Sequence, residues 1–265
     1  MGAEHPDSLA ARSNLALSYW RAGRTGEAIP LLEQAVADHE RLLGAQHPGT
    51  LNARNNLALS YWQAGRTGEA IPLLEQVVAD HERLQGAQRP GSLMARNNLA
   101  ASYRDAGRTG EAIPLLEQVV ADSQRLQGAQ HSTTLMARVN LAHAYRKAGR
   151  TGEAIPLLEQ VVADSQRLQG AQHPNALAAR TNLALSYRQA GRTVEAIVIE
   201  EHVVAERERL LGAEHPDTLI ARDNLAWLLL GGGSHRGSDP PPGTGRRRPR
   251  AAAGCRAPRH PDRSE

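Results

Sequence analysis

The sequence of 265 residues contains no phenylalanine, a single cysteine and only 3% aromatic residues. One cysteine, Cys255, excludes an intramolecular disulfide and any zinc site that needs several thiolates. Sheets draw on aromatic and β-branched side chains, whereas alanine and leucine, which are abundant here, suit closely packed helices. The composition therefore predicts an all-α fold.

Long apolar runs are also missing. No segment approaches the roughly 18 consecutive apolar residues that suggest a membrane span. The first residues, Met1 to Pro6, lack the basic and apolar regions of a signal peptide. We therefore expect a cytoplasmic protein that does not insert into membranes.

The net charge of +3 is distributed unevenly along the chain. Of the 31 Lys and Arg and the 28 Asp and Glu, 8 and 3 respectively lie in residues 231–265, which leaves the rest of the chain at −2. Binding to nucleic acid depends on basic side chains that neutralise phosphates. Because the repetitive part of the chain has no such excess, we do not expect nucleic-acid binding.

A segment near Gly65 recurs as a near copy every 42 residues. A fixed period of this length indicates a repeat architecture, in which each unit buries its apolar face against the next. The tripeptide Gly-Arg-Thr marks the successive units and begins at Gly23, Gly65, Gly107, Gly149 and Gly191.

Each unit reads as two helices joined by a glycine. Pro48, after His47, stands where proline starts a helix, and apolar residues at helical spacing extend that helix to about Ala64. Gly65 then ends it, since glycine can adopt the left-handed conformation that closes helices. Thr67 is in position to cap a second helix of about five turns. The unit is therefore predicted to be a helical hairpin.

Motifs that would indicate catalysis are missing. His39-Glu40 and His81-Glu82 lack the second histidine of a metalloprotease helix, and no phosphate-binding Gly-x-x-x-x-Gly-Lys loop occurs. The connector histidines recur a full period apart, which favours a role at helix starts over metal binding; they are His5, His47, His173 and His215. We predict no enzymatic activity and no cofactor.

Several residues of the second unit carry a family resemblance. Asn56-Leu57-Ala58, Tyr61, Gly65 and Glu69-Ala70-Ile71 resemble the tetratricopeptide repeat. The 42-residue length and the connector Leu-Gly-Ala-x-His-Pro are similar to the kinesin-light-chain subtype, in a bacterial-type array. The resemblance covers residues 1 to about 230. It implies an α-solenoid of stacked helical hairpins, a right-handed superhelix with five helix pairs and the first helix of a sixth.

Residues 231–265 are rich in Gly, Pro and Arg, a composition typical of a disordered tail. Read one base later, permitted codons for Ser234 to Pro261 spell Glu-Ala-Ile-Pro-Leu-Leu-Glu-Gln and the rest of a second helix, in step with the repeat. We hypothesise that the tail is a frameshifted repeat and that the chain is a fragment of a longer array. The uncapped ends would favour self-association.

Candidate binding residues lie on one face of the first helices. That face varies between otherwise copied units, as a recognition surface would, although drift on a solvent face gives the same pattern. An asparagine recurs beside it although asparagine is a poor mid-helix residue, so its amide either bonds to a neighbouring helix or, as the light-chain resemblance implies, binds an extended peptide. The predicted peptide-binding residues are Asn14, Asn56, Asn98, Asn140, Asn182, Trp20, Trp62, Arg104, Arg146, Arg188 and His143.

Two functions remain open at this point. The first is a non-catalytic protein–protein interaction scaffold that binds an extended peptide in its concave groove. Arginine grips carboxylates, so the peptide would combine apolar and acidic residues. The alternative is the sensor or regulatory arm of a larger signalling ATPase-type protein. A nucleotide-binding motif in the neighbouring reading frame would favour the alternative.

Overall fold

A computed structural model describes residues 12, 15, 16, 18–20 and 22–230. Within this part of the chain every regular element is a helix, which confirms the predicted all-α class. The boundaries repeat with the period of the sequence, and the first helix of the second unit spans the predicted residues. The helices are α2 (Thr25–Leu43), α3 (Pro48–Gln63), α4 (Thr67–Gln85), α5 (Pro90–Asp105), α6 (Thr109–Gln127), α7 (Ser132–Lys147), α8 (Thr151–Gln169), α9 (Pro174–Gln189), α10 (Thr193–Leu211) and α11 (Pro216–Leu229).

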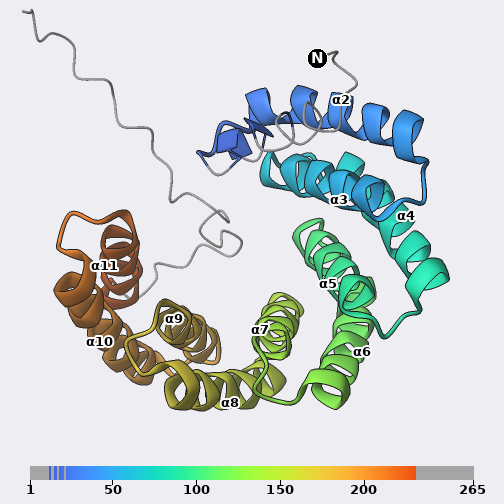
Figure 1. The fold of residues 1–265 in the computed structure, drawn as a ribbon. Coiled ribbons are helices and arrows are strands. Elements are labelled where there is room, and N and C mark those ends of the chain that lie inside the picture. The colour runs from blue at the N-terminus through green and yellow to red at the C-terminus, as the bar shows by residue number, and fades with distance from the viewer. Residues whose placement is uncertain (1–11, 13–14, 17, 21, 231–265) are drawn as a thin grey trace, which may run out of the picture.

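The hairpins stack side by side into an open arc (Figure 1). Helices α3, α5, α7 and α9 form the inner side of the arc, and α2, α4, α6, α8 and α10 form its outer side. Each helix packs against the helices before and after it in the chain, and α5, α7 and α9 also contact one another in turn. The result is the predicted α-solenoid of stacked helical hairpins.

The connector histidines start the inner helices. The Nδ1 atom of His47 accepts a hydrogen bond from the backbone N–H of Gly49 at 3.1 Å. The other described connectors that carry histidine, His131, His173 and His215, make the same bond two residues on. Their predicted helix-start role is thereby confirmed.

The turn between the two helices of a unit corrects one expectation. Gly65 has φ +77° and ends α3 as predicted. Thr67, however, does not cap α4: it is already the first helical residue, and the capping position belongs to Arg66, whose side chain makes no capping bond. Instead the Arg66 carbonyl accepts hydrogen bonds from the N–H groups of Glu69 and Ala70, each at 3.1 Å.

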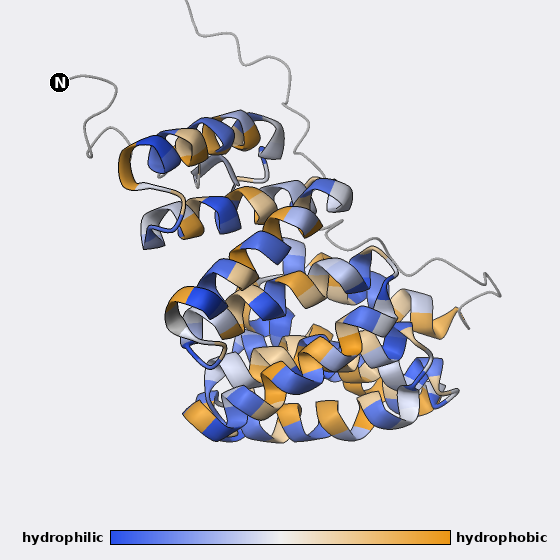
Figure 2. Cartoon of the chain, turned by 90° about the vertical axis from the view of Figure 1, so that its right-hand side faces the viewer, coloured by the Kyte–Doolittle hydropathy of each residue, from blue (hydrophilic) through white to orange (hydrophobic). Residues whose placement is uncertain are grey.

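Leucine and alanine build the core, as the composition predicts. Leu74, Leu116 and Leu158 occupy the same position in successive outer helices, and all three are fully buried. Alanines such as Ala112 and Ala154 are also fully buried and let the helix backbones approach closely. Apolar residues are spread along all the helices and do not form a separate layer (Figure 2). The core therefore runs the length of the arc.

A tyrosine ties each hairpin to the one before it. The Tyr145 hydroxyl donates a hydrogen bond to Glu117 at 2.7 Å, and the Arg150 guanidinium lies 4.5 Å from the centre of the tyrosine ring. Burial, together with the bond to Glu117, raises the pKa of Tyr145 to about 12. Three other units repeat this arrangement, through Tyr61, Tyr103 and Tyr187.

Three predictions fall on residues that the structure does not describe. These are the helix-start role of His5, the peptide-binding role of Asn14 and the disordered, frameshifted tail at 231–265. All three lie outside the described residues and stay predictions.

Candidate functional site

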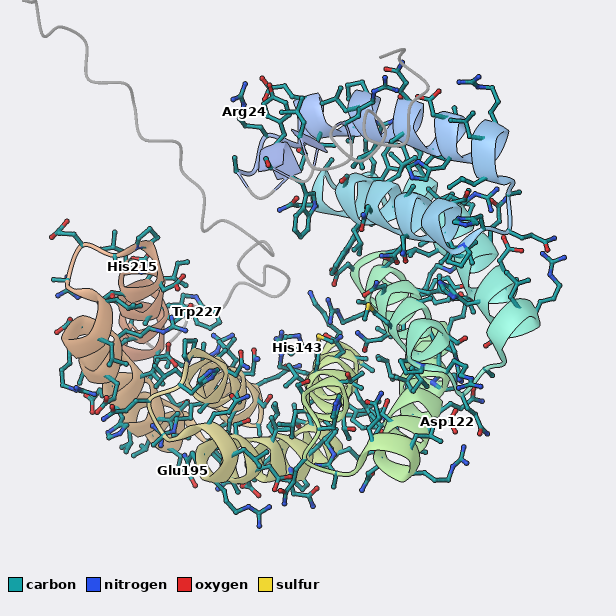
Figure 3. All side chains as sticks on the ribbon, in the orientation of Figure 1. Arg24, Asp122, His143, Glu195, His215 and Trp227 are labelled. Carbon is teal, nitrogen blue, oxygen red and sulfur yellow. The ribbon has the colours of Figure 1, made fainter. Side chains whose placement is uncertain are left out.

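The variable face of the first helices is turned to the inside of the arc. His143 of α7 and Trp227 of α11, labelled in Figure 3, both point inward. Residues three, four or seven positions away from His143 share its side of the helix. We call this side of α3, α5, α7, α9 and α11 the inner face.

A chain of hydrogen bonds crosses the middle of the inner face. The Trp62 indole N–H donates to Oδ2 of Asp105 at 3.0 Å, and Oδ1 of Asp105 accepts from Nε of Arg104 at 2.8 Å. The same guanidinium then reaches α7, where it lies 3.4 Å from Oδ1 of Asn140 and 3.5 Å from Nδ1 of His143. Four of the predicted residues are therefore joined, through an aspartate that the prediction did not include.

His143 extends this chain to the next hairpin. Its Nε2 lies 2.7 Å from Oδ1 of Asn182 on α9. Because Arg104 can only donate, Nδ1 of the imidazole must accept, and Nε2 must then carry the proton that is donated to Asn182. Burial and the positive field of Arg104 lower the pKa of His143 to about 4. The ring is thus neutral at pH 7, with both of its nitrogens engaged.

Two of the recurring asparagines donate a hydrogen bond to an asparagine of the neighbouring unit. Nδ2 of Asn98 donates to Asn55 at 3.1 Å, and Nδ2 of Asn140 donates to Asn97 at 3.0 Å. The partner in each case lies on the previous inner helix, 43 residues earlier in the chain. These two amides therefore stabilise the stacking of hairpins, which is the structural alternative left open by the sequence.

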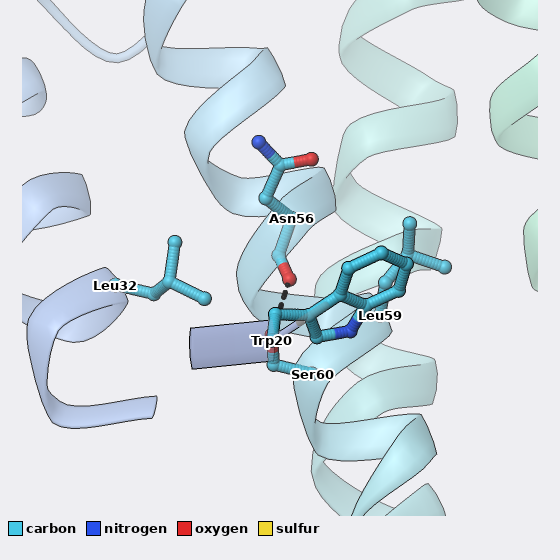
Figure 4. A pocket seen from close by; sticks show the side chains of 5 residues that line it. All are labelled: Trp20, Leu32, Asn56, Leu59 and Ser60. Atoms are coloured by element: carbon cyan, nitrogen blue, oxygen red, sulfur yellow. Dashed lines mark hydrogen bonds between the residues drawn. The ribbon is translucent and has the colours of Figure 1, made fainter. Parts of the chain in front are cut away.

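The aromatic residues occupy the two ends of the inner face. Near the first described residues, Trp20, Asn56 and Leu59 line one small pocket (Figure 4). At the other end, the Arg188 guanidinium lies over the ring of Trp227. Trp227 was outside the predicted set, although it occupies the same position in its unit as His143.

The inner face carries basic residues on α5, α7 and α9. The charge of Arg104 is offset by the adjacent Asp105 on α5. On α7 the corresponding pair is Arg146 and Lys147, both basic, and on α9 the residue after Arg188 is the neutral Gln189. The Arg146 carbonyl accepts a hydrogen bond from Gln189 at 2.9 Å, which holds these two helices together.

Two exposed methionines complete the middle of the inner face. Met94 precedes Asn98 by one turn, and Met136 precedes Asn140 by the same spacing. Their side chains are 50% and 47% exposed. Thioether side chains are flexible and adapt to varied apolar groups. This part of the inner face therefore offers apolar contacts next to amides and cations.

The described residues form neither a metal-binding cluster nor a membrane-spanning helix. No group of three or more His, Cys, Asp and Glu side chains in that part of the chain is placed to hold a metal ion. None of the described helices combines the length and the apolarity needed to span a bilayer.

The fold and the inner face define a repeat protein made of helical hairpins, and comparison with known families specifies which kind. The sequence model of the tetratricopeptide repeat matches residues 7–83, 69–125, 91–164 and 133–205. The chain therefore belongs to the tetratricopeptide repeat family. No curated protein sequence matched the chain.

Solved structures identify the subtype of repeat. A Podosopora anserina protein with nearly identical TPR-like repeats, assigned as a kinesin light chain, is 37% identical with a TM-score of 0.66, over 78% of this chain and 98% of that one. The 42-residue unit is thus of the kinesin-light-chain type, as the resemblance implied.

More distant structures share the fold. Rap protein, crystallised with Competence and Sporulation Factor, is 12% identical with a TM-score of 0.57, over 86% of this chain and 72% of that one. Bacillus thuringiensis PlcR, crystallised with the peptide PapR7 and DNA, is 13% identical with a TM-score of 0.59, over 83% and 74%. At this identity the likeness is one of fold alone.

Proposed function

We propose that this protein is a non-catalytic interaction scaffold that binds an extended peptide segment along its inner face. The observation that carries the proposal is the division of the repeat into constant and variable parts. The turn and tyrosine contacts recur from unit to unit, whereas the side chains of the inner face differ between units, as Leu59, His143 and Trp227 do at one repeat position. When the side chains of one face vary while the rest of each repeat stays constant, that face is suited to recognition of a particular partner.

The chemistry of the inner face favours a peptide with apolar and acidic residues. Asn98 and Asn140 present amides that can pair with the backbone of an extended chain. Met94 and Met136 provide apolar contacts beside them. Arg146, together with Lys147 and Arg188, supplies the positive charge for carboxylates. Arg104 contributes less to this attraction than the sequence suggested, because Asp105 offsets its charge.

The fold relatives support a peptide as the ligand. The structure of PlcR contains the peptide PapR7, and Rap protein was crystallised with Competence and Sporulation Factor. At least one distant relative with this fold thus forms a complex with a peptide. The proposal transfers that class of ligand, and no particular peptide, to the present chain.

Peptide selection against the full chain tests the proposal. Short random peptides displayed on phage are selected on the immobilised protein, and enriched sequences are synthesised and titrated by fluorescence anisotropy. We expect enriched peptides to contain Asp or Glu next to apolar residues. Arg146→Ala should weaken their binding by about tenfold or more, since hydrogen bonds to charged groups contribute roughly 1.5–3 kcal/mol.

An arginine on the outer side provides the matched control. Arg167 lies on α8, its side chain is exposed, and it pairs with Asp164 at 2.7 Å. Arg167→Ala removes the same charge from the outer side and should leave binding unchanged. Equal binding by the wild type and a folded Arg146→Ala variant would refute the inner-face assignment, as would a selection that enriches no peptide.

The alternative, a regulatory arm of a larger signalling ATPase-type protein, uses the same inner face and differs only in what surrounds it. It stays a prediction, as do the cytoplasmic location and the self-association through the ends. Sequencing the gene beyond both ends of this reading frame tests the alternative directly.

A further inference from the structure

One buried carboxyl group departs from the repeat pattern. Glu200 of α10 occupies the position that holds leucine in each of the other four outer helices, α2, α4, α6 and α8. Its residue is only 1% exposed, as buried as the leucines it replaces. The substitution therefore places an ionisable group inside the core between α9 and α11.

The carboxyl group of Glu200 is incompletely hydrogen bonded. Its Oε1 accepts from the Thr181 hydroxyl on α9 and from Nδ2 of Asn224 on α11, both at a long 3.4 Å. Its Oε2 is buried and has no hydrogen-bond partner. An ionised carboxylate has four acceptor sites, so two weak bonds leave most of its hydration uncompensated. The site suits a neutral, protonated carboxyl better than a charged one.

Neighbouring charges compensate this burial only in part. The field of Arg207, on α10 itself, opposes the rise in the pKa of Glu200, and its guanidinium is engaged with the Asp217 carbonyl at 2.8 Å. On α9, Arg180 acts on Glu206 instead. On α11, Arg222 pairs with Glu208 at 2.7 Å, and Asp223 is exposed. Burial accordingly raises the pKa of Glu200 despite the field of Arg207.

The hydrogen bond from Asn224 places the Glu200 carboxyl at the interface between α10 and α11. We call such an interface between helices a seam. In α5 and α7 the recurring asparagine donates to an asparagine of the previous inner helix. The corresponding residue for Asn224 is Thr181, which has no amide oxygen, and Asn224 donates to Glu200 instead. The apolar contacts at this seam comprise a small cluster of Leu177, Val203, Val204 and Ala221 with Leu225 alongside, and the buried Leu228 of α11, which joins the main core cluster.

From this geometry we propose that Glu200 is a proton-controlled latch for α11. The neutral carboxyl fits the core and keeps α11 docked on α10. Loss of the proton creates a buried charge, which is relieved when α11 separates and water reaches the group. Opening also exposes Val203 and Val204, the residues of α10 that pack with Ala221 of α11.

The sign of the pH dependence follows from proton binding. The docked state holds a proton on Glu200 at pH values where the open state, with an ordinary carboxyl, has lost it. Docking is therefore strongest below the ordinary pKa of a glutamate. It weakens as the pH rises toward the raised pKa of the docked state, by at most about tenfold per pH unit for one proton.

Amide hydrogen exchange of the full chain, followed by mass spectrometry from pH 5 to 8, tests the proposal. After correction for the intrinsic pH dependence of exchange, peptides from α11 report the latch and peptides from α5 serve as the internal reference. In the wild type we expect protection of α11 to fall with rising pH, by up to about tenfold per unit, while protection of α5 stays constant.

Two variants separate the latch from other causes. Glu200→Gln keeps the shape but cannot ionise, and Glu200→Leu restores the residue of the other units. Both should show α11 protection that no longer depends on pH. The same pH dependence in either variant, a constant or absent protection of α11 in the wild type, or an equal change in α5 would each overturn the proposal. Peptide binding to the inner face is not measured, so this result is independent of the proposed function.

Discussion

The seam between α7 and α9 contains the half-buried His143, and the seam between α10 and α11 contains the buried Glu200, with opposite consequences. His143 has both imidazole nitrogens engaged, by Arg104 and by Asn182. Glu200 has one oxygen on two long bonds and the other without a partner. The neutral imidazole is therefore fully hydrogen bonded, whereas an ionised Glu200 would lack partners for its charge. A polar side chain in the core of a repeat protein thus leaves stability unchanged only where the neighbouring unit supplies its hydrogen-bond partners.

The largest expected effect comes from placing a glutamate, the residue at position 200 of α10, at the equivalent position 158 of α8. Leu158 is fully buried, and the residue in the place of Thr181 on its preceding inner helix is Val139, which cannot donate a hydrogen bond. Leu158→Glu should therefore lower the free energy of unfolding by about 3–5 kcal/mol, through the lost apolar burial and the uncompensated carboxyl. Urea unfolding followed by circular dichroism measures the loss.

A leucine on the surface of the same helix is the control for that variant. Leu168 is exposed, and Leu168→Glu should change the free energy of unfolding by no more than about 0.5 kcal/mol. A similar loss in the free energy of unfolding for Leu158→Glu and Leu168→Glu would contradict the assignment of Leu158 to the core.

Acid should weaken the seam of His143, the reverse of the effect on Glu200. The pKa of His143 is lowered to about 4, so its neutral form stabilises the folded state. That contribution is complete above the ordinary pKa of about 6.5 and is lost as the pH falls toward 4. We expect a loss of about 1–3 kcal/mol over this range.

The measurement is a comparison of urea unfolding at pH 7 and pH 4.5 in the wild type and in His143→Leu. Leucine occupies this position in other units, at Leu59 and Leu185, and cannot titrate. The variant should lose less stability on acidification than the wild type. An identical loss would assign the acid sensitivity to other groups.

The smallest expected effect comes from giving α11 the tyrosine that the other units use. Leu229 occupies the position of Tyr187 and is 59% exposed. Glu201 lies 28 residues before it, the separation that joins Tyr187 to Glu159. Leu229→Tyr should add about 0.5–1 kcal/mol through this bond, measured as increased protection of α11 from hydrogen exchange.

Tyr187→Phe is the reverse test in a unit that already has the bond, and it should lose a similar amount. If Leu229→Tyr leaves α11 unchanged while Tyr187→Phe destabilises its own unit, the α10–α11 seam differs from the others in geometry as well as in side chains.

Much of the site could be predicted because it follows from position within a repeat. Periodicity placed Trp62, Arg104, His143 and Arg146 on one face, and the structure places that face on the inside of the arc. The signal for Glu200 was also present, since leucine stands at the aligned position in the other four outer helices. What could not be predicted was the pairing of Arg104 with Asp105, because it depends on the rotamers of adjacent side chains.

The sequence alone determined the helices, their boundaries, the turn glycines and the order of the hairpins. These features depend on spacing, proline and glycine placement and apolar periodicity within a single unit. Only the tertiary structure decided which side chains meet across units: Asn98 with Asn55, Arg104 with His143, and Asn224 with Glu200. Such contacts are set by the shift and rotation of one hairpin on the next, and these arise from packing between units.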